Sequence, residues 1–71
     1  MSKSAHRALL KAINTTGSQV QMAKLLGVTQ AAVSHWARNG KLLPPQHTLK
    51  VEAATGVSRH ELRPDIYPVE P

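Results

Sequence analysis

The chain has 71 residues and a mass of 7.7 kDa, which is the size of one small domain and excludes a multidomain enzyme. It has no Cys, so disulfides and thiolate metal sites are excluded and packing must stabilise the fold, which suits a reducing compartment. No run approaches the roughly 18 apolar residues of a membrane span, and the N-terminus lacks the apolar core of a signal peptide. We therefore expect an unprocessed, soluble, cytoplasmic protein that does not bind membranes.

The charge is distributed unevenly along the chain. Nine Lys and Arg outnumber four Asp and Glu, giving a formal net charge of +5, and the sequence pI is about 10.3. Seven of the cations precede Glu52, the first acidic residue, and they are Lys3, Arg7, Lys11, Lys24, Arg38, Lys41 and Lys50. This asymmetry indicates a polyanionic partner, although a basic protein without an anionic ligand would show it too.

A first helix is expected from Ala5 to about Asn14, with Ser4 as its N-cap. Its apolar residues follow the i, i+3, i+4, i+7, i+8 pattern of an amphipathic helix, at Ala5, Ala8, Leu9, Ala12 and Ile13. The opposite face carries a basic stripe of Lys3, Arg7 and Lys11.

Two further helices are expected in quick succession. The second begins at Ser18, which has capping-box spacing to Gln21, and ends at Gly27, because a left-handed residue after a helix is least strained without a Cβ. Thr29 is the expected N-cap of the third, which closes at Asn39. The apolar sides of the two helices are formed by Met22, Ala23, Leu25, Leu26, Ala32, Val33, Trp36 and Ala37.

A fourth helix is expected from Pro45 to Thr55, and a short fifth from Ser58 to Leu62. Proline fits the first turn of a helix because its missing N–H has no intrahelical partner there. Ser58 has capping-box spacing to Glu61.

No segment shows the alternating pattern of a strand, so an all-α fold is expected. The sequence predicts a compact bundle of about five short helices over residues 1–63. Because only 3% of the residues are aromatic and none is Phe, the core should be aliphatic and built around Trp36. A proline-rich tail over residues 64–71 should lack regular structure, except for a short extended arm.

The segment 19–36 has the spacing of a helix-turn-helix. Ala23 is small where a second helix must cross closely, and Gly27 permits a sharp turn four residues later. Apolar side chains that would lock the two helices together stand at Met22, Leu26, Val28, Val33 and Trp36. Such a motif projects its second helix into a DNA major groove. The same spacing also occurs in ordinary helical hairpins, and a helix-turn-helix can serve protein contacts.

The segment from Ser18 to Gly40 resembles the helix-turn-helix of phage Cro and cI-type repressors. Within it, residues 31–36 are similar to the same stretch of the smallest lambdoid Cro proteins. The continuation through Pro44, residues 52–57 and residues 62–65 resembles the YdaS-type antitoxin-like regulators. The resemblance covers about residues 5 to 67 and implies a lambda-repressor-like DNA-binding domain.

The resemblance implies a role for the exposed positions of the motif. DNA base contacts would come from Gln30, Ala31, Ser34 and His35, and phosphate contacts from Gln19, Thr29 and Ala32. The Gln30 amide can pair with adenine N6 and N7, whereas Ala31 offers only a methyl contact to thymine. Two alternatives remain, namely a merely solvated Gln30 and a Ser34 hydroxyl bonded back to its own helix. His35 stands where many relatives have Gln, so the base read there is open.

Arg38 and Lys41 are candidate phosphate contacts and Lys24 lies near them, although each could equally be a solvated charge. The four His are dispersed and no two are four residues apart, so we expect no metal site. We also expect no cofactor and no catalytic residue, since the sequence offers no nucleophile with a base and no glycine-rich phosphate loop.

We expect a Cro-like repressor that binds palindromic operator sites in double-stranded DNA. One short helix reads few bases, so a homodimer is expected, formed in solution or only on DNA. Its contact surface would lie on the fourth and fifth helices and the tail, unless the tail folds back onto the core, with apolar area from Leu62, Ile66, Tyr67 and Val69. The alternative is a YdaS-type antitoxin whose tail neutralises a partner toxin while the helix-turn-helix autoregulates the operon.

Overall fold

The first helix is longer at both ends than its apolar pattern predicts. The computed structural model describes residues 2–68, and α1 runs Ser2–Thr16. Ser4 is therefore an exposed residue inside the first turn and not the N-cap, which corrects our expectation. The helix continues past Asn14, where the Thr15 hydroxyl donates to the Lys11 carbonyl oxygen at 2.9 Å and so satisfies its polar group within the helix.

The predicted turn between the second and third helices is confirmed. The Ser18 hydroxyl caps α2 (Gln19–Leu26) by accepting the Gln21 N–H at 3.2 Å, although within the described residues Gln21 does not return the bond. Gly27 has a φ of 70°, in the left-handed region, which allows the following N–H to turn back and donate to the Ala23 carbonyl oxygen at 3.0 Å. The chain leaves the turn at Thr29 and enters α3 (Gln30–Arg38).

The fourth predicted helix is in two parts. Pro45–His47 form a single 3-10 turn, η1, which leads into α4 (Thr48–Thr55), so the α-helix begins three residues later than expected. Ser58 caps α5 (Arg59–Leu62) as predicted, but its hydroxyl accepts the N–H of His60, at 3.1 Å, and not that of Glu61. An N-cap side chain can bond either of these two positions, and the sequence spacing alone does not choose between them.

The core is aliphatic, as predicted, but Trp36 is not its centre. The largest fully buried side chains come from all five α-helices and from the linker after α3, and they are Leu9, Met22, Val33, Leu43, Thr48, Val51 and Leu62. Trp36 is half-buried and packs against the edge of this cluster, with its ring centroid 6.1 Å from that of His47. Val33 is the innermost residue of α3, so the indole, almost one turn later, lies between the core and the surface.

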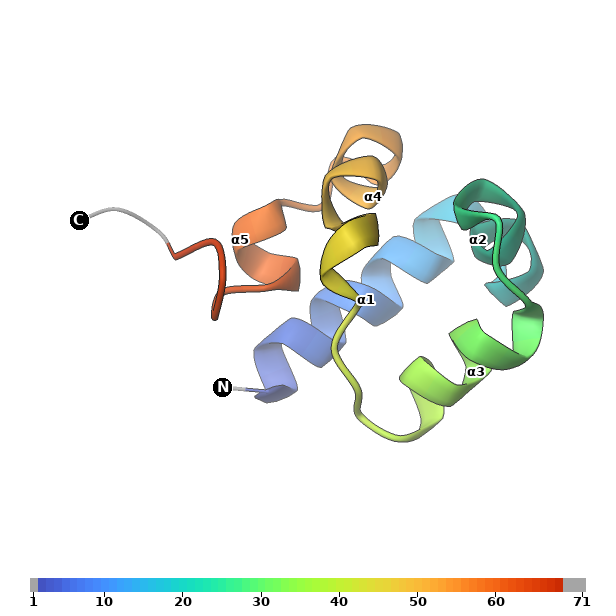
Figure 1. Ribbon diagram of the computed structural model, residues 1–71, viewed down its shortest axis with the longest axis horizontal. Coiled ribbons are helices and arrows are strands. Elements are labelled where there is room, and N and C mark those ends of the chain that lie inside the picture. The colour runs from blue at the N-terminus through green and yellow to red at the C-terminus, as the bar shows by residue number, and fades with distance from the viewer. Residues whose placement is uncertain (1, 69–71) are drawn as a thin grey trace.

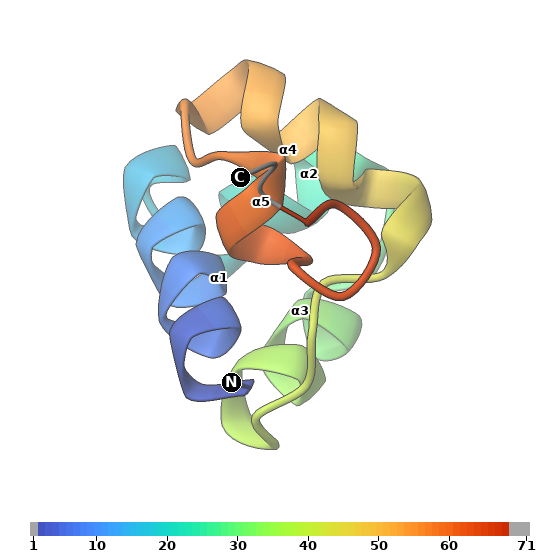
Figure 2. The same cartoon turned by 90° about the vertical axis from the view of Figure 1, so that its left-hand side faces the viewer.

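The arrangement separates the two ends of the molecule. Figure 1 shows α2 and α3 together at one end and α5 with the C-terminal segment at the other, with α1 running between them. Seen from the α5 end, α5 lies between α1 and α4, and it packs on both (Figure 2). Among residues 2–68 there is no strand, and no helix there is both long and apolar enough to cross a membrane. The all-α fold is therefore confirmed.

The described part of the tail, residues 64–68, forms a turn in which Tyr67 lies against α5, and most of its side chains remain exposed. The Tyr67 N–H donates to the Arg63 carbonyl oxygen at 2.9 Å, and the Arg63 guanidinium donates through Nη1 to the Leu43 carbonyl oxygen at 2.8 Å. The first residues after α5 are thus tied to the body of the bundle. The domain boundary after Arg63 stays a prediction, and the end of the tail, 69–71, lies outside the described residues.

Candidate nucleic-acid interface

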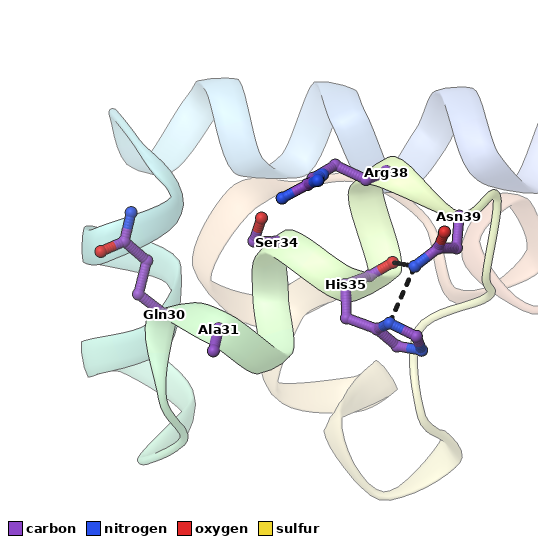
Figure 3. A pocket seen from close by; sticks show the side chains of 6 residues that line it. All are labelled: Gln30, Ala31, Ser34, His35, Arg38 and Asn39. Atoms are coloured by element: carbon purple, nitrogen blue, oxygen red, sulfur yellow. Dashed lines mark hydrogen bonds between the residues drawn. The ribbon is translucent and has the colours of Figure 1, made fainter.

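One side of α3 forms a shallow depression of about 520 Å³. Six residues line it, in two rows with four-residue spacing along the helix, and they are Gln30, Ala31, Ser34, His35, Arg38 and Asn39. Figure 3 shows Gln30 and Ala31 at the N-terminal end of this surface and His35 and Asn39 at the other end. Five of the six are exposed and Ser34 is half-buried.

This side of α3 is exposed because the other side packs inward. Val33 is fully buried, and Trp36 and Ala37 lie partly buried against the core. The small side chain of Ala23, which is 5% exposed, lies in α2, and α2 and α3 make extensive contacts. The two rows that line the depression therefore face outward, because α3 cannot rotate about its axis without exposing its apolar side.

The N-terminal end of α3 presents free backbone donors. The Thr29 hydroxyl oxygen accepts the Ala32 N–H at 3.1 Å, so that N–H is already satisfied. The N–H groups of Gln30 and Ala31 belong to the first turn, which has no intrahelical acceptors, and they lie at the positive end of the helix dipole, in residues that are exposed. Gln19 stands at the first position of α2 and is half-buried.

The C-terminal end of α3 turns sharply into the linker. Gly40 has a φ of 63°, and the Lys41 N–H donates back to the Trp36 carbonyl oxygen at 3.1 Å. Lys41 and Arg38 are both exposed there. Asn39 ends the helix, and its side-chain nitrogen lies 2.8 Å from the His35 ring nitrogen Nδ1, a contact drawn in Figure 3.

The Lys and Arg residues before Glu52 and those after it differ in whether they form ion pairs. In the described part of the chain both ion pairs lie after residue 51, with N···O distances of 2.9 Å for Arg59–Glu52 and 2.6 Å for Arg63–Asp65. The pKa of the Glu52 carboxyl lies below its ordinary value of 4.5, first because it accepts the Arg59 backbone N–H. The pKa of the Asp65 carboxyl lies below 3.8, first because it accepts hydrogen bonds from the Arg63 side chain. These carboxylates are thus engaged locally.

The exposed cations around α3 have no carboxylate partner among residues 2–68, and they are Lys24, Arg38 and Lys41. Arg7 and Lys11 are also exposed on α1, whereas the side chain of Lys3 lies outside the described part. The part of the described chain that holds α2, α3 and the following linker is therefore positively charged, with Arg38 in the depression itself.

The structure brings together all four residues that were predicted to contact bases. The Ser34 hydroxyl has no hydrogen-bond partner in the part of the chain that is described, which argues against its bonding back to its own helix. Asn39 is the lining residue that sequence reasoning missed, because it was treated only as a helix stop. Its four-residue spacing from His35 was the available signal, since such pairs meet on a helix surface.

The predicted dimer surface needs one correction. Leu62 is 1% exposed and belongs to the core, because α5 packs its apolar side against α1. Tyr67 is half-buried, with the Arg59 guanidinium carbon 5.8 Å from the centre of its ring. Ile66 is 44% exposed, as is Leu49 of α4 at 48%. Val69 lies outside the described residues.

Comparisons with known proteins agree with this arrangement. The chain matches the family model described as bacterial toxin YdaS over residues 9–71. A relative from Escherichia coli strain K12, whose name describes it as a transcriptional regulator, YdaS, is 36% identical over 66 residues, covering 90% of this chain and 67% of the relative. The gene 30 protein of Enterobacteria phage phi80 is 39% identical over 64 residues, covering 89% of this chain and 88% of its own length.

A solved structure has the same fold. The Cro protein from the prophage element Xfaso 1 in Xylella fastidiosa strain Ann-1 superimposes with a TM-score of 0.79 and is 38% identical, covering 87% of this chain and 97% of that one. The expected resemblance to both Cro and YdaS proteins is confirmed.

Proposed function

Since this chain belongs to the YdaS family, we propose that it is a Cro-like transcriptional regulator that binds double-stranded DNA in a sequence-specific way. The observation that carries the proposal is the pair of residue rows on α3, from Gln30 to Asn39, that line the depression. A nine-residue helix braced from behind by Val33 and Trp36 has the shape that enters a major groove. The protein acts by binding, and we assign it no catalytic step.

The roles of the side chains follow from their positions. Gln30, Ala31, Ser34 and His35 contact base edges. Phosphates are held by Gln19 and Thr29, which stand at the N-terminal ends of α2 and α3, by Arg38 and Lys41 near the C-terminal end of α3, and by the helix end at residues 29–32. Because the Ala32 N–H is bonded to Thr29, we assign the phosphate there to the first two N–H groups of α3.

We infer that two copies bind a palindromic operator and repress transcription by covering a promoter. One helix of nine residues reads only a few base pairs, and half-sites one turn apart, about 34 Å, supply the rest. Within the described residues, Leu49 on α4 and Ile66 after α5 are exposed large apolar side chains available for this contact. Gel-shift stoichiometry on one and two half-sites tests the dimer, and equal affinity per copy on both would contradict it.

The test of DNA reading starts from a random pool of duplexes. The preferred duplex is isolated by repeated selection and titrated into isotope-labelled protein, and backbone amide shifts are recorded. We expect the largest changes at Thr29–Asn39 and small changes at α5, which lies at the other end of the molecule (Figure 1). Motionless α3 resonances, or a pool that never converges on a sequence, would refute the proposal.

The antitoxin alternative has no specific observation in its favour, since the family description names a toxin and the relatives are named as regulators or by gene number. It is tested by expressing the chain with its genomic neighbour. Ile66→Asp is preferable to deletion of residues 63–71, because Arg63 holds the linker at Leu43 and the loss of Arg63 would disturb the bundle. Toxicity that is relieved by the wild-type chain and not by this variant would favour the antitoxin.

A further inference from the structure

Asn39 contacts His35 at two atoms. Its side-chain Nδ2 lies 3.1 Å from the His35 carbonyl oxygen and 2.8 Å from the ring nitrogen Nδ1, and both contacts are drawn in Figure 3. A carbonyl oxygen only accepts hydrogen bonds, so the amide atom beside it must be the NH2 group and not the amide oxygen. One hydrogen of this NH2 goes to the carbonyl, and the other goes to Nδ1.

This contact determines which ring nitrogen of His35 carries the hydrogen. An amide NH2 only donates, so Nδ1 must accept and carries no hydrogen. In the neutral ring the hydrogen therefore lies on Nε2. Nε2 has no partner within residues 2–68, and the exposed ring lines the depression on α3. His35 thus offers a hydrogen-bond donor to a ligand there.

We propose that Asn39 is a positioning residue that fixes His35 as a donor, so that His35 reads a guanine. This inference rests on the proposed function. Guanine presents two adjacent acceptors in the major groove, N7 and O6, whereas adenine places an amino group beside N7, thymine a methyl group beside O4, and cytosine only an amino donor. The fixed N–H donor of His35 can bond to either acceptor of guanine, whereas the amino groups of adenine and cytosine are themselves donors and oppose it. A Gln at position 35 could both donate and accept through its amide, so it would not distinguish guanine from adenine in this way.

The first test measures the tautomer in the free protein. Proton–nitrogen correlation spectra of the imidazoles at about pH 8, where an unperturbed histidine is neutral, should show the His35 hydrogen on Nε2. Asn39→Asp, whose carboxylate only accepts, should move it to Nδ1. His60 is an internal control of the opposite kind, since its Nδ1 lies 2.7 Å from the Tyr67 carbonyl oxygen and must donate. A wild-type His35 protonated on Nδ1 overturns the inference, even if DNA binding is intact.

The second test locates the base. Each guanine of the preferred duplex is replaced in turn by 7-deazaguanine, which lacks N7, or by 6-thioguanine, whose sulfur is a weaker acceptor than O6. At one position the replacement should weaken wild-type binding about five- to tenfold, the effect of one hydrogen bond. It should not weaken binding by His35→Ala, and it should weaken binding by Asn39→Ala less than binding by the wild type. Both variants should keep wild-type helicity, and their losses of affinity should be larger on duplexes that carry this guanine than on duplexes that lack it.

The outcomes separate this inference from the proposed function. If the wild-type chain prefers no duplex, both fail. If it has a preferred duplex in which no guanine is coupled to His35, only the reading of guanine fails. If His35→Ala loses the same amount of affinity on every DNA sequence, the ring contacts a phosphate and not a base, and the inference is also overturned.

Discussion

The His6 ring, near the start of α1, donates its Nε2 hydrogen to the Ala37 carbonyl oxygen at the end of α3, across 2.7 Å. The carbonyl only accepts, so the direction of the bond is fixed. The two residues are 31 positions apart, and the bond is partly buried. It ties the long first helix to the C-terminal turn of the helix that we propose enters DNA, and so restrains the angle at which α3 projects.

Replacing His6 should therefore loosen α3. We expect His6→Ala to lower the free energy of unfolding by about 1 kcal/mol, since a partly buried carbonyl loses its donor. Urea denaturation measures this change as a shift of the unfolding midpoint, and the m-value should stay the same. Arg7→Ala, at the exposed neighbouring position, should have little effect. Equal stability of the two variants would show that the bond contributes nothing.

Gln30→Ala should weaken binding to the preferred duplex by about 1 to 3 kcal/mol and relax the preference at one base pair, because a bidentate contact to a base is lost. Binding to random duplex should not change. The matched control is Gln46→Ala, at an exposed position of η1. Fluorescence anisotropy measures the affinity of the wild type and of both variants for each of the two duplexes. Equal losses by Gln30→Ala on specific and random DNA would rule out base reading by Gln30.

Lys41→Ala should weaken binding to all sequences alike, because a phosphate contact carries no sequence information. The plot of log affinity against log salt concentration should become shallower by about 1, as one fewer counterion is released. Lys50→Ala, at an exposed position of α4, makes the same change in charge outside α3 and should leave the slope closer to that of the wild type. A sequence-dependent loss at Lys41 would contradict its assignment to a phosphate.

Ala23→Leu should destabilise the crossing of α2 and α3. Ala23 is 5% exposed, and extra methylenes in a packed site cost about 1 to 3 kcal/mol. For a domain of this size each kcal/mol lowers Tm by roughly 4–8 °C, which calorimetry resolves easily. Ala54→Leu, at an exposed position of α4, is the control. If both variants melted with the wild type, the close approach at Ala23 would be disproved.

Glu52 should make stability depend on pH in the acidic range. Its carboxylate accepts the Arg59 N–H and Nε–H, each at 2.9 Å, and its pKa is lowered from 4.5 in the folded protein. A lowered pKa means that this stabilisation is complete above about pH 4.5 and is lost as the pH falls through the folded value. Glu52→Gln should therefore have a lower Tm at about pH 6 and a smaller further fall by about pH 3. An unchanged pH profile would contradict this.

Local chemistry in the sequence determined the ends of the central helices. Thr29 and Ser18 accept N–H groups of the following turn, and Gly27 adopts the left-handed φ that ends α2, as their spacing predicts. The spacing of apolar residues in the sequence also predicted correctly that Val33 lies on the inward side of α3, away from its polar side. These features depend on hydrogen bonds and torsion angles within a few residues, so no tertiary information was needed.

Only the tertiary structure decided which distant residues meet. The burial of Leu43 depends on where the linker packs, and the half-exposure of Trp36 depends on where the His47 ring of η1 lies beside it. A periodicity within one helix does not contain that information. The same holds for the bond of His6 to Ala37, and for that of Arg63 to Leu43, 20 positions away. Burial and long-range hydrogen bonds depend on how separate elements pack, and each chain segment by itself is compatible with many packings.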